Sequence, residues 1–234
     1  MAEQTDRFDL TAALALATVA HAGQDEKGLG TPYLGHLLRV ASTVIRAGGS
    51  PDQARAALLH DAVEDGGRTW WPAVAAFGPT VEAIVQTCTD AAPAEDEQKA
   101  PWYDRKITHI RELHEGRRPD GEPVPAEAWL VLAADKLDAI DRSHTALDRS
   151  GDAFWGQGLF KGGRVGSVWY WRAMVEAIAP HLDEPLATEL VERVRSLARR
   201  ASRGDEHLDE IDLDELLEAA RNTPYPDGIR EDQR

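Results

Sequence analysis

The sequence predicts an all-α protein, and three observations support that fold class. Apolar residues recur at helical spacing in stretches that are separated by glycine- and proline-containing breaks. Residues that favour helix starts stand at the beginning of several of these stretches. Alternating apolar and polar runs rich in Val, Ile and Thr, which are typical of strands, do not occur. A chain of 234 residues suits one domain with a sizeable core and room for an appendage.

The first three predicted helices contain most of the polar residues that suggest chemistry. The first helix covers residues 8–21 and stops at a glycine. The second covers 31–47 and opens with Thr-Pro, an N-cap followed by proline in the first turn. The third covers 50–66 without a break, and Ser50 with Gln53 fits a capping box at its start.

Further helices follow from the same signals. Residues 91–101 and 116–125 are polar, proline-containing breaks, and the segment after residue 150 is rich in glycine. The stretch 126–146 is strongly apolar, which predicts a buried helix. The acidic tail from Gly204 contains one amphipathic stretch at 211–221. The remaining predicted helices cover residues 69–77, 79–90, 102–115, 126–146, 164–180 and 184–203.

Composition excludes several classes of protein. The chain has 26 Lys and Arg against 41 Asp and Glu, a net charge of -15, which argues against nucleic-acid binding over a wide surface. No apolar run approaches the roughly 20 residues of a membrane helix, and the N-terminus lacks the pattern of a secretory signal. Cys88 is the only cysteine, so an internal disulfide is impossible and we expect a cytoplasmic protein.

An unusual cluster of acids and one histidine lies near the end of the third helix. His60, Asp61, Glu64 and Asp65 fall within an arc of roughly 140° if the helix is continuous. No basic residue stands nearby to pair with them, and crowded acids repel one another unless a cation lies among them. A metal site and a hydrated acidic surface both remain open from this geometry.

Two further residues favour the metal interpretation. His36 is flanked by leucines on the second helix, a pattern that a core histidine also shows. Asp135 lies in a very apolar helix, where a metal ion or a salt bridge to Lys136 or Arg142 would satisfy its charge. With His60 and Asp61 they make a mixed nitrogen and oxygen set, which suits Mn²⁺ or Fe²⁺, with zinc as a further possibility.

This arrangement resembles the HD-domain metal-dependent phosphohydrolases. The resemblance is closest to the branch that contains the hydrolase domains of RelA/SpoT proteins and the small alarmone hydrolases. It covers about residues 8–146 and implies an all-α helical bundle with a metal site in its centre. The matching segments are AHAGQ (20–24), TPYLGH (31–36), LLHDAVED (58–65) and ADKLDAI (134–140), with WYDRK (102–106) and FKGGRVGSVWYWRAM (160–174) similar to a bacterial subgroup.

The resemblance implies roles for individual residues. Glu64 and Asp65 match the acidic pair near the attacking water, which marks hydrolysis of a 3′-pyrophosphate within this family. Ala139 stands where many relatives have an asparagine that helps to hold the nucleotide, which leaves the substrate open. The implied metal ligands are His36, His60, Asp61 and Asp135, with Mn²⁺ as the expected ion.

An acidic protein needs local cations to hold an anionic nucleotide. The stretch Lys161-Gly162-Gly163-Arg164 combines two cations with the start of a helix, although a solvated glycine turn fits it equally well. Tyr33 is placed either to stack on a base or to pack in the core. Lys136 points away from its neighbour Asp135 along the helix and is expected to brace the bundle. The predicted substrate-binding residues are Lys27, Tyr33, Lys106, Lys161, Arg164 and Tyr170.

These observations predict a hydrolase domain over residues 1–203, with a metal-binding part (8–146), C-terminal helices (147–203) and an acidic tail (204–234). The expected reaction is removal of the 3′-pyrophosphate from (p)ppGpp, giving GDP or GTP. The alternatives are an HD phosphatase for another nucleotide, such as a nucleoside monophosphate, an adenosine alarmone or NADPH, and a nucleotide-sensing module without turnover. The tail could instead recruit a protein partner. A small-molecule substrate is expected, with no nucleic acid and no membrane.

Overall fold

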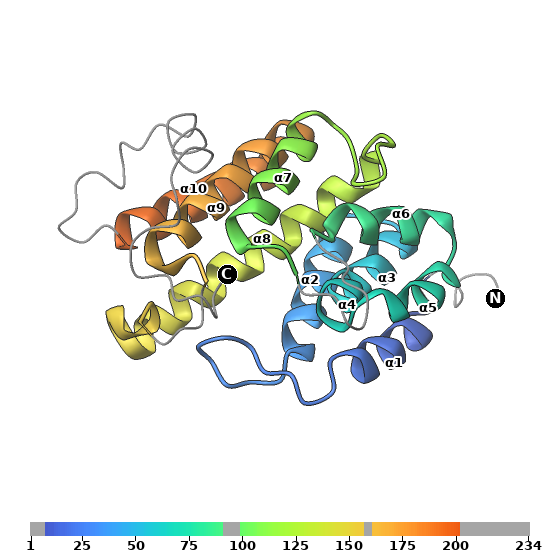
Figure 1. Ribbon diagram of the computed structural model, residues 1–234, viewed down its shortest axis with the longest axis horizontal. Coiled ribbons are helices and arrows are strands. Elements are labelled where there is room, and N and C mark those ends of the chain that lie inside the picture. The colour runs from blue at the N-terminus through green and yellow to red at the C-terminus, as the bar shows by residue number, and fades with distance from the viewer. Residues whose placement is uncertain (1–7, 91–98, 157–160, 202–234) are drawn as a thin grey trace.

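The computed structural model describes residues 8–90, 99–156 and 161–201. These residues form helices and turns, and their only extended pairings are two isolated β-bridges. The predicted all-α fold class is therefore confirmed (Figure 1). The α-helices are α1 (Thr11–Ala20), α2 (Leu34–Arg46), α3 (Pro51–Leu59), α4 (Ala62–Gly66), α5 (Trp71–Ala75), α6 (Pro79–Cys88), α7 (Trp102–His114), α8 (Ala126–Ser150), α9 (Gly163–Ile178) and α10 (Glu184–Ala201).

Helix α8 is the central element of the fold. It packs against α2, α3 and α6 and also against α9 and α10, and these two groups lie on either side of it in Figure 1. Its residues Leu132 and Ile140 are almost completely buried, and full burial of such a side chain contributes about 1.5–3 kcal/mol. Because α8 is held on both sides, the polar residues Asp135 and Asp138 on it have fixed surroundings.

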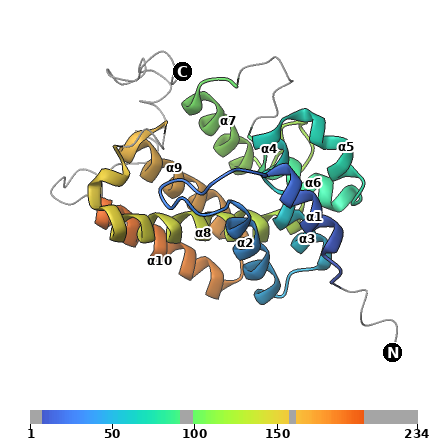
Figure 2. The same ribbon diagram turned by 90° about the horizontal axis from the view of Figure 1, so that it is seen from below.

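The start of α2 differs from the predicted one. The helix begins at Leu34, three residues after Thr31, because the preceding residues pair with the loop before them. Pro32 forms a β-bridge with Asp25, and the N–H of Tyr33 donates to the carbonyl of Gln24 at 2.9 Å. Figure 2 shows this loop running between α1 and α2. The pairing holds the loop residues Gln24 and Asp25 beside the start of α2.

The helix predicted over residues 50–66 is interrupted. Helix α3 ends at Leu59, and α4 begins only at Ala62. The Nδ1–H of His60 donates to the carbonyl of Ala57 at 2.9 Å, the carbonyl that accepts the N–H of Asp61 in a regular helix. Asp61 itself has φ -98° and ψ -4°. The arc calculated for a continuous helix is therefore wrong in detail.

Most other predicted elements are confirmed. The capping box of α3 is present, since the Ser50 hydroxyl accepts the N–H of Gln53 and the Gln53 side chain accepts that of Ser50. Helix α8 continues to Ser150, beyond the predicted end at residue 146. The acidic tail and its amphipathic stretch lie outside the described residues, as does most of the predicted break at 91–101. Among the helices described, none has the length and apolar character needed to cross a bilayer.

Candidate metal centre

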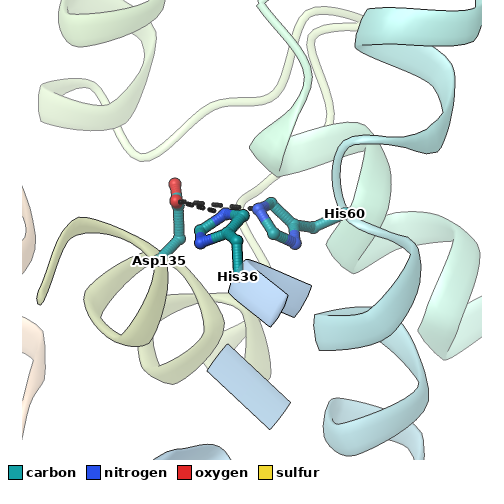
Figure 3. A group of neighbouring side chains, drawn as sticks. All are labelled: His36, His60 and Asp135. Atoms are coloured by element: carbon teal, nitrogen blue, oxygen red, sulfur yellow. Dashed lines mark ion pairs between the residues drawn. The ribbon is translucent and has the colours of Figure 1, made fainter. Parts of the chain in front are cut away.

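Three buried side chains converge beside α8 (Figure 3). His36 lies on α2, His60 directly follows α3, and Asp135 lies on α8. One ligand atom from each lies within 4.8 Å of the other two. The Oδ1 atom of Asp135 is 3.5 Å from Nε2 of His36 and 3.6 Å from Nε2 of His60. The three side chains thus point toward one small region.

Asp61 belongs to the same group. Its Oδ2 atom is 3.0 Å from Nε2 of His60 and 3.6 Å from Nε2 of His36. The hydroxyl of Tyr33 donates a hydrogen bond to that oxygen. The bend between α3 and α4 is what turns Asp61 toward His60. The structure therefore brings together the four residues that the sequence predicts as ligands.

In its neutral form, each histidine presents the lone pair of Nε2 to the carboxylates. The Nδ1–H of His36 donates to Asp138 at 2.6 Å, and that of His60 donates to the carbonyl of Ala57. Each Nε2 atom is buried and has no hydrogen-bond partner. Lone pairs of nitrogen and carboxylate oxygen repel one another at these distances unless a cation or a proton lies between them. Two imidazole nitrogens with carboxylate oxygens form a donor set that fits a divalent metal.

The charges at this centre strongly influence one another. Burial alone would lower the pKa of His60, but the carboxylates of Asp61 and Asp135 raise it well above its ordinary value. Burial opposes the charge of Asp135, yet Lys136 and His60 hold the pKa of that carboxyl far below its usual range. The ammonium of Lys136 lies 2.6 Å from Asp135. Lys136 thus places positive charge beside these carboxylates.

The acidic pair lies at the edge of the same cavity. Glu64 and Asp65 both line it, together with Asp61 and Asp135. The carboxylate of Glu64 is 3.7 Å from the ammonium of Lys106, and burial raises its pKa to about 7. Asp65 is exposed and accepts a hydrogen bond of 2.7 Å from the side chain of Gln24. The two acids therefore differ in surroundings, one enclosed and one open to solvent.

The cavity is also lined by cationic and aromatic side chains. The ammonium groups of Lys106 and Lys136 lie over the ring of Tyr170, at 4.7 and 5.2 Å from its centroid. The ammonium of Lys106 pairs with Asp90 and also lies 3.7 Å from Glu64. The cationic residues that line the cavity are Lys27, Lys106, Lys136 and Arg142, and its aromatic residues are Tyr33, Trp102, Phe154, Tyr170 and Trp171.

The predicted substrate-binding residues divide into two groups. Lys27, Tyr33, Lys106 and Tyr170 line the cavity, whereas Lys161 and Arg164 do not. The guanidinium of Arg164 donates to the carbonyl of Ala201 at the end of α10 at 3.1 Å. The ring centroid of Tyr33 lies 5.0 Å from that of His21 and 5.1 Å from that of His36. Its hydroxyl donates a hydrogen bond to the predicted ligand Asp61.

Several residues of the site were not predicted from the sequence. Lys136 forms the salt bridge to Asp135 that the sequence offered as one alternative, but its place in the cavity lining was not predicted. Arg142, considered only as a salt-bridge partner, also lines the cavity. Asp138 contacts His36 and was not singled out. The signal that draws attention to Asp135, an acid in an apolar helix, applies equally to Asp138 one turn later.

Sequence comparisons relate the chain to known proteins. Residues 13–118 match the family model described as the HD domain. The guanosine-3′,5′-bis(diphosphate) 3′-pyrophosphohydrolase MESH1 of Xenopus tropicalis is 45% identical over 109 residues, 46% of this chain and 53% of that protein. Human MESH1 is 34% identical over 110 residues, 46% and 54% of the two chains. This chain spans about half the length of the curated relatives it matches.

Two solved structures are similar in fold. A metazoan orthologue of SpoT, described as hydrolysing ppGpp, superimposes with a TM-score of 0.58 at 22% identity, covering 80% of this chain and 94% of that one. The protein lmo0812 from Listeria monocytogenes EGD-e gives a TM-score of 0.51 at 27% identity, covering 72% and 97%. The first likeness concerns the fold alone. Together with the buried His36, His60 and Asp135 group, these findings identify an HD fold with a candidate metal site.

Proposed function

We propose that this chain, which matches the HD-domain family model over residues 13–118 and is similar to the MESH1 enzymes over about half their length, is a phosphohydrolase that removes the 3′-pyrophosphate of (p)ppGpp. The observation that carries the proposal is the convergence of His36, His60, Asp61 and Asp135, of which Asp61 and Asp135 also line the cavity. Glu64 lines the same cavity, as do four cationic side chains. The products are GDP or GTP and pyrophosphate.

The four converging residues are proposed as the ligands of a divalent ion, and Mn²⁺ fits best. Two imidazole nitrogens and two carboxylate oxygens are a donor set that suits Mn²⁺ or Fe²⁺. Many zinc sites contain thiolates instead, and this set has none. When bound, the ion would lower the pKa of a water molecule and offset negative charge on the phosphoryl oxygens. In the neutral rings of His36 and His60, the Nδ1–H contacts leave the Nε2 lone pairs for this ion.

Glu64 is proposed as the group that takes a proton from the attacking water. Its carboxyl has a pKa near 7 because it is buried, which suits a base that works near neutral pH. Lys106 and Arg105 lie 3.7 and 3.9 Å away and restrain it. Asp65, held by Gln24 at the open side, is suited to orient the water. The water oxygen bonds to the 3′-phosphate phosphorus, the bond to the ribose oxygen breaks, and that oxygen takes up a proton.

The cationic lining compensates for the net negative charge of the chain. A charge of -15 repels a polyphosphate, but salt screens this repulsion beyond about 8 Å. Lys27 and Arg142 line the cavity and are suited to contact phosphate groups directly. Trp102 and Tyr170 offer flat surfaces to a base or ribose. The site therefore combines local attraction for a nucleotide with long-range repulsion.

One observation favours a second candidate function. Ala139 lines the cavity at the position where the resembled family often has a substrate-holding asparagine. Without that asparagine, the site would accept another phosphorylated nucleotide and hydrolyse it with the same metal centre. This alternative shares the metal centre and differs only in substrate, so a product assay separates the two.

The test uses the 234-residue chain, which is stripped with a chelator and reloaded with Mn²⁺. It is incubated with ppGpp and separately with nucleoside monophosphates, adenosine alarmones and NADPH, and the products are resolved by chromatography. We expect GDP and intact pyrophosphate from ppGpp. Phosphate released from another compound, with ppGpp untouched, would favour the second candidate. Binding without turnover of any compound would favour a sensing module and overturn the proposed reaction.

A further inference from the structure

We propose that Asp138 is a positioning residue that holds the predicted ligand His36 and the cavity residue Arg142 in fixed relation. The inference rests on the proposed metal centre. Asp138 lies on α8 one turn after Asp135, so its carboxylate approaches His36 from the side opposite the cluster. Its side chain is 7% exposed. Nothing in the proposed chemistry above assigns it a role.

The contact with His36 determines which nitrogen faces the metal position. The Oδ2 atom of Asp138 is 2.6 Å from Nδ1 of His36, and a carboxylate only accepts hydrogen bonds. The proton of the neutral ring is therefore kept on Nδ1, and the lone pair on Nε2 faces Asp61 and Asp135. Such outer carboxylates orient histidine ligands and make them more basic.

The same carboxylate is held by two arginines. Nε of Arg39 donates to Oδ1 of Asp138 at 2.5 Å, and Nε of Arg142 lies 2.9 Å from Oδ2. Glu26, almost completely buried, pairs with Arg39 at 2.5 Å and lies 3.5 Å from Arg142. Two acids thus balance two arginines in one compact group. This balance offsets the cost of burying the charges.

This group of two acids and two arginines connects α8 with the loop that lines the cavity. Arg142 lines the cavity, and Glu26 belongs to the loop that also carries the cavity residues Gln24 and Lys27. Asp138 therefore contacts, with one carboxylate, the predicted metal ligand His36 and the cavity residue Arg142, which is proposed above to contact phosphate. If Asp138 only fastened α2 to α8, loss of its charge would lower stability without a specific effect on His36.

Three variants separate positioning from simple stabilisation. Asp138→Asn removes the charge next to His36. Glu26→Gln removes a charge from the same buried group without touching His36. Asp148→Asn is a control on the same helix, where an exposed carboxylate pairs with Arg200 on α10. Each protein is measured for the free energy of unfolding, for the ¹⁵N shifts of the histidine rings without metal, and for Mn²⁺ affinity by chelator competition.

We expect a specific effect of Asp138→Asn. The ring of His36 should leave its single Nδ1–H tautomer, and the Kd for Mn²⁺ should rise about 10- to 100-fold, the usual effect of losing an outer partner. Glu26→Gln should lose stability but keep the tautomer and bind Mn²⁺ within about threefold of the unchanged protein. Asp148→Asn should alter none of the three.

An unchanged tautomer in Asp138→Asn, or equal loss of Mn²⁺ affinity in Glu26→Gln, would overturn the inference. The tautomer is read without metal, so it tests Asp138 even if the unchanged protein binds no Mn²⁺. That last result would refute the proposed metal centre rather than the role of Asp138 toward His36.

Discussion

Replacement of His109 by glutamine is expected to change how the stability of the fold depends on pH. His109 lies on α7 and is buried beside the charged residues of the site. Its Nε2–H donates to the carbonyl of Thr87 at 2.8 Å, and Nδ1 has no partner. Burial lowers the pKa of His109 to about 4, and the ammonium of Lys106 further opposes protonation. Glutamine keeps a donor for Thr87 but does not titrate.

The size of the effect follows from the two pKa values of His109. In the unfolded chain a histidine titrates near 6.5. Between pH 6.5 and about 4 the unfolded chain therefore binds more protons, and the free energy of unfolding falls as the pH falls. Each unit of difference is worth about 1.36 kcal/mol, so the complete loss approaches about 3 kcal/mol. Above the unfolded value the contribution of His109 is fully present.

The assay is urea denaturation of the unchanged protein and of His109→Gln at about pH 7.5 and about pH 4.5. Over this interval the unchanged protein should lose about 2–3 kcal/mol more than the variant. His114→Gln, which replaces an exposed histidine on the same helix, should behave like the unchanged protein. Equal pH dependence in His109→Gln and the unchanged protein would refute the reasoning.

The remaining predictions concern the site and the core. Glu64→Gln should keep metal binding but lower kcat about 10²- to 10⁴-fold, because the proton acceptor is lost, as steady-state kinetics would show; unchanged kcat would exclude Glu64 as the base. Asp61→Ala should abolish both metal binding, measured by elemental analysis, and turnover. Chelation should lower the Tm, since an ion at 100 times its Kd adds about 2.7 kcal/mol of stability; an unchanged Tm would contradict a metal held by the folded state. Ile140→Ala should cost about 2–5 kcal/mol in urea denaturation, with a value under about 1 kcal/mol contradicting its core position.

Much of the fold could be predicted because its signals are local. The capping box at Ser50 and the proline at the start of α6 set helix starts through hydrogen bonding and backbone geometry that depend on a few neighbouring residues. The apolar run of α8 predicted a buried helix for the same reason. His36, His60, Asp61 and Asp135 were found because polar residues in apolar surroundings need partners, and the resemblance supplied the combination.

Other features depend on contacts that periodicity does not contain. The end of α3 at Leu59 depends on the His60 side chain, which binds a carbonyl of its own helix. The late start of α2 depends on pairing of Pro32 with a loop residue. Asp138 was missed because its partners His36 and Arg39 lie on α2, 102 and 99 residues away in the sequence. Neither Lys161 nor Arg164 lines the cavity, and the roles predicted for them in substrate binding remain predictions.

The most direct test of the central claim is a combined titration. Chelator-stripped protein is titrated with Mn²⁺, and bound metal and release of pyrophosphate from ppGpp are measured in the same samples. Our account predicts that the rate rises in proportion to the bound metal and that Asp61→Ala shows neither. Full turnover of ppGpp by protein without metal would contradict it.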